Sequence, residues 1–138
     1  MAAATIIPHP PSVVLVVRDG DHVVLVRQHR PGAGGPVVEL PAGKVEPGES
    51  ALEAASRELA EECGLAAAGW RELGSFWAAP AYSTERITVL AAQVSGPAAA
   101  APDPDEAIEV LRVRAGEAHD HVEDAGSLAA LALAARSR

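Results

Sequence analysis

The chain has 138 residues, a length that fits one domain, so we expect a single domain over residues 1–138. Apolar residues make up 49% of the sequence but aromatic residues only 3%, which predicts an aliphatic core. The net charge is -8 and no basic run is present, which argues against non-specific binding to nucleic acid or to a membrane surface. A phosphate-bearing ligand stays compatible with this charge if metal ions and a few arginines offset the acid.

The number of cysteines and the first residues of the chain indicate the cellular compartment in which the protein is expected. Cys63 is the only cysteine, so no disulfide can form within the chain, which is compatible with a reducing cytosol. Residues 1–11 contain three prolines and no basic segment, unlike a signal peptide. We therefore expect a cytoplasmic protein.

The first elements form a predicted β-hairpin. Two Val-rich runs, residues 12–18 and 22–29, are joined by Asp-Gly-Asp, which is typical of a tight turn between antiparallel strands. A glycine-rich loop follows over residues 31–36, and a short strand is expected over residues 37–40, before Pro41.

The clearest helix begins at Ser50. Ser50 and Glu53 form a capping box, in which each side chain binds a free backbone amide of the other residue. Gly64 fits the left-handed residue that ends a helix. At about 100° per residue, one apolar face is predicted to carry Leu52, Leu59 and Cys63, which implies a buried, unreactive thiol.

The second half of the chain alternates strands with loops and ends in a helix. Strands are expected over residues 70–77, 86–94 and 107–113, with a turn at 80–84, an Ala/Pro-rich loop at 95–104 and a helix at 127–135. Strands thus precede, separate and follow the helices. This order favours an α+β fold, with helices packed on the faces of a mixed sheet.

Three carboxylates crowd the end of the predicted helix that begins at Ser50. Glu58, Glu61 and Glu62 lie within about one and a half turns, largely opposite the apolar face, where mutual repulsion costs stability unless a cation is present. Mg²⁺ prefers oxygen ligands and is held by one or two carboxylates while a substrate phosphate supplies further oxygens. Arg57, four residues from both Glu53 and Glu61, can brace either. The alternative is a solvated acidic helix face.

The segment from residue 43 to residue 65 resembles the Nudix box, Gly-x5-Glu-x7-Arg-Glu-U-x-Glu-Glu-x-Gly-U, where U is aliphatic. All nine positions match, with Leu59 and Leu65 as the aliphatic residues. The resemblance implies an α/β/α sandwich around a mixed sheet. It also implies hydrolysis of nucleoside diphosphates linked to another moiety, with Mg²⁺ or Mn²⁺ as the cofactor.

The resemblance also implies roles for individual residues. Glu58 and Glu62 resemble the main metal ligands, and Glu61 an additional one. Arg57 resembles the brace that orients the glutamates, and Glu49 a secondary carboxylate of the site. The backbone carbonyl of Ala42 or Gly43 completes the expected metal shell.

Two segments outside the box resemble the ADP-ribose pyrophosphatase branch of this family. One is Glu-Leu-Pro-Ala-Gly-Lys at residues 39–44, and the other is the loop with Pro80 fifteen residues after Leu65. By this resemblance, Glu85 is the general base for the attacking water. The alternative is a surface glutamate paired with Arg86. Ala81 stands where that branch usually has glycine, so the loop departs from the pattern.

Substrate contacts are expected from a small set of further residues. Arginines match phosphate oxygens, which makes Arg27 and Arg30 candidates for the pyrophosphate, with a surface position as the alternative for each. The further candidates are Glu39 and two aromatic residues that can stack on a nucleobase, Trp77 and Tyr82. For Trp77 a place in the core is favoured over stacking. Trp70 is assigned to packing, and His119 and His121 to the surface.

The leading functional hypothesis is metal-dependent hydrolysis of ADP-ribose to AMP and ribose phosphate. Other nucleotide sugars, or oxidised nucleoside triphosphates, remain alternative substrates, and a non-catalytic nucleotide sensor is the alternative from another class. The resemblance implies a homodimer. Because only about a dozen residues precede the first predicted strand, a shared nucleobase site is expected to be incomplete.

Overall fold

The computed structural model describes residues 3–99 and 107–137, in which seven strands and three α-helices are formed. The strands are β1 (Ser12–Asp19), β2 (His22–Arg30), β3 (Gly35–Glu39), β4 (Ala42–Lys44), β5 (Leu65–Trp77), β6 (Arg86–Pro97) and β7 (Glu109–Arg114). The helices are α1 (Ala51–Cys63), α2 (Ala118–His121) and α3 (Ala125–Arg136), with 3-10 turns η1 (Pro31–Ala33) and η2 (Ala115–Glu117).

The strands form one mixed sheet in the order β3-β2-β1-β6-β5, with β4 paired to β1 and β7 paired to β2. β1 and β6 run parallel, and the other pairs of these strands are antiparallel. The predicted hairpin is confirmed, with Arg18 opposite Val23 and Gly20 at a φ of 62°. Away from the turn, the first residues of β1 pair with β4, which makes the start of the box, at Gly43, part of the sheet.

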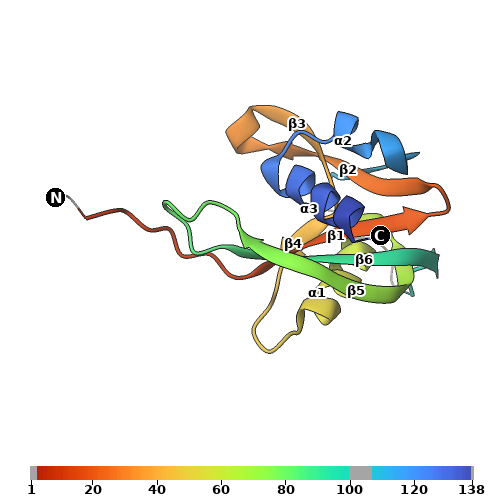
Figure 1. The fold of residues 1–138 in the computed structure, drawn as a ribbon, viewed down its shortest axis with the longest axis horizontal. Helices are drawn as coiled ribbons and strands as arrows, with labels where there is room; N and C mark the ends of the chain where they lie inside the picture. Colours follow the sequence, from red (N-terminus) through yellow and green to blue (C-terminus); the bar gives the residue numbers. More distant parts are fainter. Residues whose placement is uncertain (1–2, 100–106, 138) are drawn as a thin grey trace.

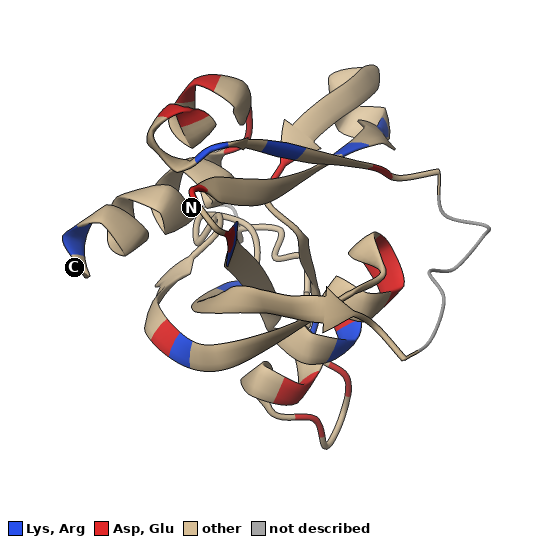
Figure 2. Ribbon diagram, turned by 90° about the vertical axis from the view of Figure 1, so that its right-hand side faces the viewer, with Lys and Arg blue, Asp and Glu red and all other residues tan. Residues whose placement is uncertain are grey.

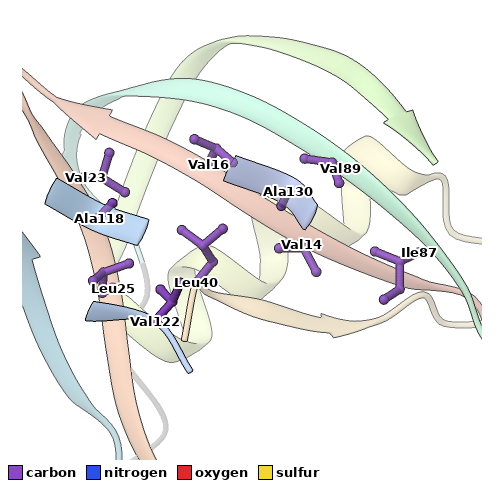
Figure 3. Packing of buried hydrophobic residues seen from close by; sticks show 10 residues of the cluster. All are labelled: Val14, Val16, Val23, Leu25, Leu40, Ile87, Val89, Ala118, Val122 and Ala130. Carbon is purple, nitrogen blue, oxygen red and sulfur yellow. The ribbon is translucent and has the colours of Figure 1, made fainter. Parts of the chain in front are cut away.

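Alternation along β1 builds a core on each face of the sheet. Successive side chains of a strand point to opposite faces. Val13, Leu15 and Val17 pack with α1, whereas Val14 and Val16 pack with the cluster that includes Ala130 of α3. Figure 1 shows α1 and α3 on opposite sides of the sheet, and Figure 3 shows the cluster on the α3 side. The predicted α+β sandwich with a mixed sheet is confirmed.

Local signals define α1. Ser50 and Glu53 form the predicted capping box, and Gly64 adopts the left-handed conformation with a φ of 67°. Leu59 is fully buried, but the prediction for Leu52 was wrong, because its side chain is 47% exposed. The face of α1 that packs on the sheet carries Ala51, Ala54 and Ala55. Leu52 lies about 100° around the helix from Ala51, so these small residues, and not Leu52, contact the sheet.

Several element bounds differ from the predicted ones. β5 begins at Leu65 rather than at residue 70, and register shifts let it continue past Gly69 and Gly74, which have positive φ angles. β6 extends to Pro97 into the predicted loop, of which residues 100–104 lie outside the described residues. α3 starts at Ala125 because the Asp124 side chain accepts a hydrogen bond from Ser127 N.

The segment before β1 and the loop between β5 and β6 project together from the sheet (Figure 1). Ile7 N donates to Tyr82 O at 2.6 Å, and Thr84 N donates to Ile7 O at 3.2 Å. The side chains of Ile7 and Tyr82 are 54% and 55% exposed. The two segments thus form one arm with apolar side chains in solvent.

Acidic and basic residues are interspersed over strands and helices on the face drawn in Figure 2. Arg136 lies in the last turn of α3, where a positive charge complements the helix dipole.

Within residues 3–99 and 107–137, no helix has the length and apolar character needed to cross a membrane.

Candidate active site

One cavity of about 610 Å³ collects polar side chains from the sheet, from α1 and from the start of α3. Its wall is formed by β1 to β4, the last turns of α1, the segment around β5 and β6, and the start of α3. Of the residues predicted for the site, the cavity brings together Arg30, Glu39, Ala42, Glu58, Glu62, Trp77 and Glu85. Glu49, Glu61, Arg27 and Tyr82 do not line it.

The two carboxylates of α1 that line the cavity sit in different surroundings. Glu62 is 7% exposed, and its Oε1 accepts a hydrogen bond from Ala42 N at 3.2 Å. Glu58 Oε1 accepts one from Arg57 Nη1 at 2.9 Å. Burial raises the pKa of Glu58, and the hydrogen bond and charge of Arg57 oppose this rise. The expectation that Glu62 lies largely opposite the buried face was wrong, because it is enclosed between α1 and β4.

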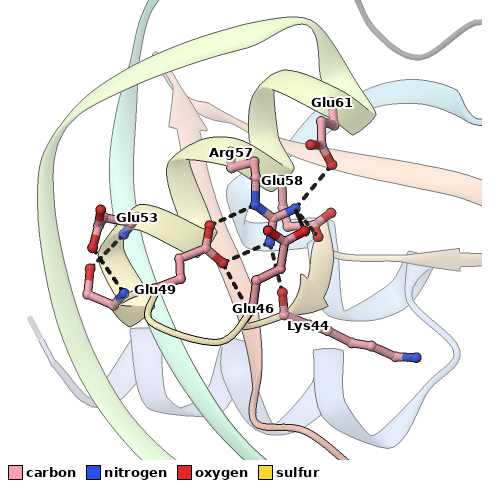
Figure 4. Close-up of polar contacts among 8 residues, drawn as sticks. Lys44, Glu46, Glu49, Glu53, Arg57, Glu58 and Glu61 are labelled. Atoms are coloured by element: carbon pink, nitrogen blue, oxygen red, sulfur yellow. Dashed lines mark hydrogen bonds and ion pairs between the residues drawn. The ribbon is translucent and has the colours of Figure 1, made fainter.

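Arg57 ties the carboxylates of the box together (Figure 4). Its Nε and Nη2 bind the two oxygens of Glu49 at 2.8 and 2.9 Å, and its Nη1 binds Glu61 at 3.2 Å. Nη2 also donates to the carbonyl of Lys44 at 2.9 Å. The hydrogen bond from Arg57 lowers the pKa of Glu49 to about 2. Arg57 therefore braces Glu49, Glu58 and Glu61, while Glu53 is used by the capping box.

Gly43 lets β4 pass directly against Glu58. A Cβ built on Gly43 would overlap the Glu58 carboxylate carbon and Oε1 and lie 2.5 Å from its Cγ. Real Cβ atoms essentially never come this close to another heavy atom. The glycine at the start of the box therefore serves a close approach, and its own φ is not in the left-handed range.

Glu85 faces the cavity from the end of the loop between β5 and β6. Its Oε2 accepts a hydrogen bond from Ser12 Oγ at 2.6 Å, and His9 Nδ1 lies 3.8 Å from the same oxygen. Glu85 and the α1 carboxylates line one cavity, although they come from segments more than twenty residues apart. Arg86 does not pair with Glu85 and instead stacks on Trp77, with its guanidinium carbon 4.7 Å from the ring centroid.

Arg30 and Glu39 form a bidentate pair on the wall built by β2 and β3. Arg30 Nε and Nη2 lie 2.9 and 2.7 Å from the two Glu39 oxygens. Glu39 is 7% exposed, and its hydrogen bond raises the pKa of Arg30. A buried carboxylate thus fixes the orientation of a guanidinium that lines the cavity.

The start of α3 contributes residues that the sequence reasoning missed. Asp124 and Ser127 line the cavity, and Ser127 Oγ accepts a hydrogen bond from Leu40 N at 2.9 Å. The signal available in the sequence was Asp-x-x-Ser before an Ala/Leu run, a capping pattern. His9, Ser12 and Gln28 also line the cavity and had no distinguishing signal.

Three aromatic and basic candidates lie differently from expectation. Trp77 is 54% exposed at the cavity, so its preferred place in the core was wrong. Arg27 Nη1 pairs with Glu109 at 2.9 Å outside the cavity, and Tyr82 lies on the projecting arm. Binding of substrate by Arg27 or Tyr82 stays a prediction. Trp70 packs against the core on the α1 side, as predicted.

The remaining candidates agree with expectation in part, because Cys63 is half-buried rather than buried. Burial raises the pKa of the Cys63 thiol to about 12, so the thiol stays protonated near neutral pH. His119 and His121 are exposed.

The fold and this cavity define a Nudix-type domain, and the NUDIX domain family matches residues 8–131. The chain belongs to this family. It is 35% identical over 121 residues to an ADP-ribose pyrophosphatase of Bacillus subtilis (strain 168), covering 86% of this chain and 65% of that protein. It is 31% identical over 113 residues to the ADP compounds hydrolase NudE of Escherichia coli (strain K12), covering 82% of this chain and 61% of that protein.

A solved structure described as an ADP compounds hydrolase superposes with a TM-score of 0.83 at 27% identity. The superposition covers 92% of this chain and 71% of that one. The chain spans about three fifths to two thirds of the length of the curated relatives named above.

Proposed function

We propose that the chain hydrolyses the pyrophosphate bond of a nucleoside diphosphate linked to another moiety, with ADP-ribose as the leading substrate and AMP and ribose phosphate as products. The observation that carries this proposal is that Glu58, Glu62 and Glu85 line the same cavity. Two relatives named for ADP-ribose or ADP compounds, each more than 30% identical, support the substrate class.

The residues present fit a divalent metal ion such as Mg²⁺ or Mn²⁺. Glu58 and Glu62 offer carboxylate oxygens at one wall, and Gly43 keeps the backbone of β4 free of a side chain beside them. In the described part of the chain, no three acidic, His or Cys side chains form a metal cluster by themselves. Glu58, Glu61 and Glu62 are therefore not gathered into one metal-ready cluster, and a Mg²⁺ ion held by Glu58 and Glu62 would complete its shell with waters, carbonyl oxygens and phosphate.

Glu58 and Glu62 are the proposed main ligands, with the carbonyl of Ala42 or Gly43 beside them. Glu61 and Glu49 are the proposed additional carboxylates, which would have to leave Arg57 to join the site. A bound metal ion would polarise the phosphoryl oxygens and lower the pKa of a bound water.

Glu85 is the proposed general base. A base must come within hydrogen-bond reach of the attacking water, and Glu85 already faces the cavity with one oxygen bound to Ser12 Oγ. We expect Glu85→Gln to lower kcat by about 10²–10⁴-fold while KM changes little. A matched Glu72→Gln, at an exposed position of β5, should leave kcat unchanged. Equal kcat values for the two variants would remove Glu85 from this role.

Substrate positioning is proposed for Arg30, held by Glu39, at the pyrophosphate and for Trp77 at the nucleobase. The exposed ring of Trp77 leaves room for stacking, although Arg86 occupies one of its faces. Arg27 and Tyr82 are weaker candidates because both lie outside the cavity.

The test of the function is a substrate panel with Mg²⁺, Mn²⁺ and EDTA, using ADP-ribose, other sugar nucleotides and oxidised nucleoside triphosphates. The triphosphates belong in the panel because a putative 8-oxo-dGTP diphosphatase of Bacillus subtilis (strain 168) is 40% identical over 63 residues, covering 46% of this chain and 40% of that protein. We expect metal-dependent turnover to be fastest with ADP-ribose and absent in EDTA. No turnover on any member, together with a ligand-raised melting temperature, would favour the sensor alternative.

Glu62→Gln tests the metal assignment. It keeps an Oε1 acceptor for the Ala42 amide but removes the charge, so the fold should persist while turnover is lost. Turnover at the wild-type rate in this variant would overturn the assignment.

A cytoplasmic homodimer is the proposed state. The exposed Ile6, Ile7 and Tyr82 of the projecting arm are the apolar side chains that a second copy would cover. In light scattering, we expect the wild type to have the molar mass of a dimer. Ile7→Ser should show a lower average mass at the same protein concentration, because its dimer is weaker.

A further inference from the structure

A second cavity, of about 460 Å³, lies between α3 and the sheet and shares no lining residue with the cavity that holds Glu58. Its floor includes Val16 of β1 and Val23 of β2, two members of the core cluster drawn in Figure 3. Its other wall includes Leu128 and Leu131 of α3. The volume lies within the range of about 300–1,000 Å³ that is usual for small-molecule sites.

Three strands supply polar side chains to this cavity. Val14, Val16 and Arg18 alternate along β1 and therefore share a face, so the apolar row on the α3 side ends in a guanidinium. Gln93 of β6 lies opposite Arg18, and Arg71 of β5 lies opposite Ala91 in the next row. Arg18, Arg71 and Gln93 all line the cavity, with His119 of α2 at the same wall.

The charge in this cavity is unbalanced. Two arginines and a histidine line it, and none of its described lining residues is Asp or Glu, although the chain as a whole carries a net charge of -8. The Nε of Arg18 is buried and has no hydrogen-bond partner within the described residues.

The nearby C-terminal end of α3 offers a simpler role for these arginines, because positive charge is favourable there. That role needs no acceptor within the cavity, but it does not account for Gln93 and His119, which line the same space. It also gives no reason for the apolar side chains of Leu128 and Leu131 to line the space beside the guanidinium.

We propose that this cavity is a second ligand site, which binds a small amphipathic anion. The carboxylate or phosphate head accepts hydrogen bonds from Arg18 and Arg71, since a guanidinium matches both anions. The apolar body packs against the partly exposed side chains of Leu128 and Leu131 of α3. This site is independent of the proposed hydrolysis, because its residues and those of the catalytic cavity are separate.

The test measures binding of the fluorescent anion 1-anilinonaphthalene-8-sulfonate to the full chain, beside its neutral analogue N-phenyl-1-naphthylamine. We expect Arg18→Leu to weaken binding of the sulfonate at least tenfold and to leave binding of the neutral analogue within about twofold. Arg112→Leu is the matched control, because Arg112 is an exposed arginine that pairs with Asp19 outside both cavities. Equal sulfonate affinity in the two variants would overturn the proposal.

Two further variants keep the test decisive if Arg18→Leu does not fold. Arg71→Leu changes an exposed residue of the cavity wall and should also weaken the sulfonate, and Ala132→Trp, on the exposed side of α3, should block the site. Trp77→Ala, in the catalytic cavity, should leave the affinity for the sulfonate probe unchanged. Loss of binding in Trp77→Ala but not in Arg71→Leu would place the probe in the catalytic cavity and refute the proposal.

Displacement of the probe separates the two kinds of head group. Octanoate and octyl phosphate, which share an eight-carbon chain and differ in the head group, are titrated against the bound sulfonate in the wild type and in Arg18→Leu. Displacement by either anion in the wild type, reduced at least tenfold by the variant, supports the site and names its head group. Displacement by neither anion would contradict it.

Discussion

Replacement of Gly43 by alanine is expected to disable the site without unfolding the protein. The new Cβ would occupy the space of the Glu58 side-chain carboxylate, so Glu58 must rotate away from β4. The backbone itself tolerates alanine, since the φ of Gly43 is not in the left-handed range. The effect is therefore steric and confined to one side chain.

The magnitude follows from what Glu58 loses when it moves. The hydrogen bond from Arg57 Nη1, 2.9 Å long, joins side chains that are 24% and 15% exposed, and such charge-assisted bonds contribute about 1.5–3 kcal/mol. Relief of the burial that raises the Glu58 pKa offsets part of this loss. We expect a net destabilisation of about 1–2 kcal/mol. Misplacement of a reactive group by about 1 Å costs about 10²-fold, so we expect kcat to fall at least that far.

The assay combines thermal unfolding with ADP-ribose turnover at saturating Mg²⁺. Gly35→Ala is the matched control, because a Cβ added there would meet nothing within 4 Å and the φ of Gly35 is not positive. The control should match the wild type in both measurements. Wild-type turnover in Gly43→Ala would refute the reasoning, since it would show that Glu58 need not occupy the space beside Gly43.

Two further predictions concern stability. Leu59→Ala should cost about 2–5 kcal/mol because Leu59 is fully buried, whereas Leu52→Ala on the same helix should stay within about 0.5 kcal/mol, as measured by urea unfolding. Similar losses for both would contradict the observed burial. Arg57 holds the pKa of Glu49 at about 2, below its ordinary 4.5, so the stability from this pair is full above about pH 4.5 and is lost as the pH falls toward 2. The stability difference between wild type and Glu49→Gln should therefore shrink over that range, and a constant difference would argue against the pair.

Local signals made α1 predictable from the sequence. The capping box at Ser50 and the left-handed Gly64 depend on neighbouring residues only, so they survive any tertiary arrangement. The apolar periodicity located Leu59 but failed for Leu52, because periodicity gives the direction of a side chain and not the presence of a neighbour. The start of β5 was missed because Gly69 interrupts the strand pattern in the sequence. In the structure, β5 pairs with β6 on both sides of Gly69, with a bulge between Ala68 and Arg71.

The cavity itself could be predicted only in part. Resemblance placed Glu85 beside the helix carboxylates, and the structure brings Glu58, Glu62 and Glu85 to one cavity. Asp124 and Ser127 reach the same cavity through the packing of α3, and no spacing in the sequence relates residue 127 to residue 40. Arg27 does not reach it because Gln28 and Arg30 of the same strand face the cavity, so alternation turns Arg27 to the other face, where it pairs with Glu109.

The carboxylates of the box divide into two groups, and this division could not be read from their spacing. Glu49 and Glu61 turn toward Arg57, whereas Glu62 turns toward the amide of Ala42, and Glu58 lies between the two groups. One guanidinium serves four carboxylates, so negative charge remains on the cavity side. Helical spacing brings the glutamates together, but the close passage of β4 at Gly43 decides which of them face the cavity. A cation arriving there would meet Glu58 and Glu62 first, with Arg57 holding Glu49 and Glu61 behind them.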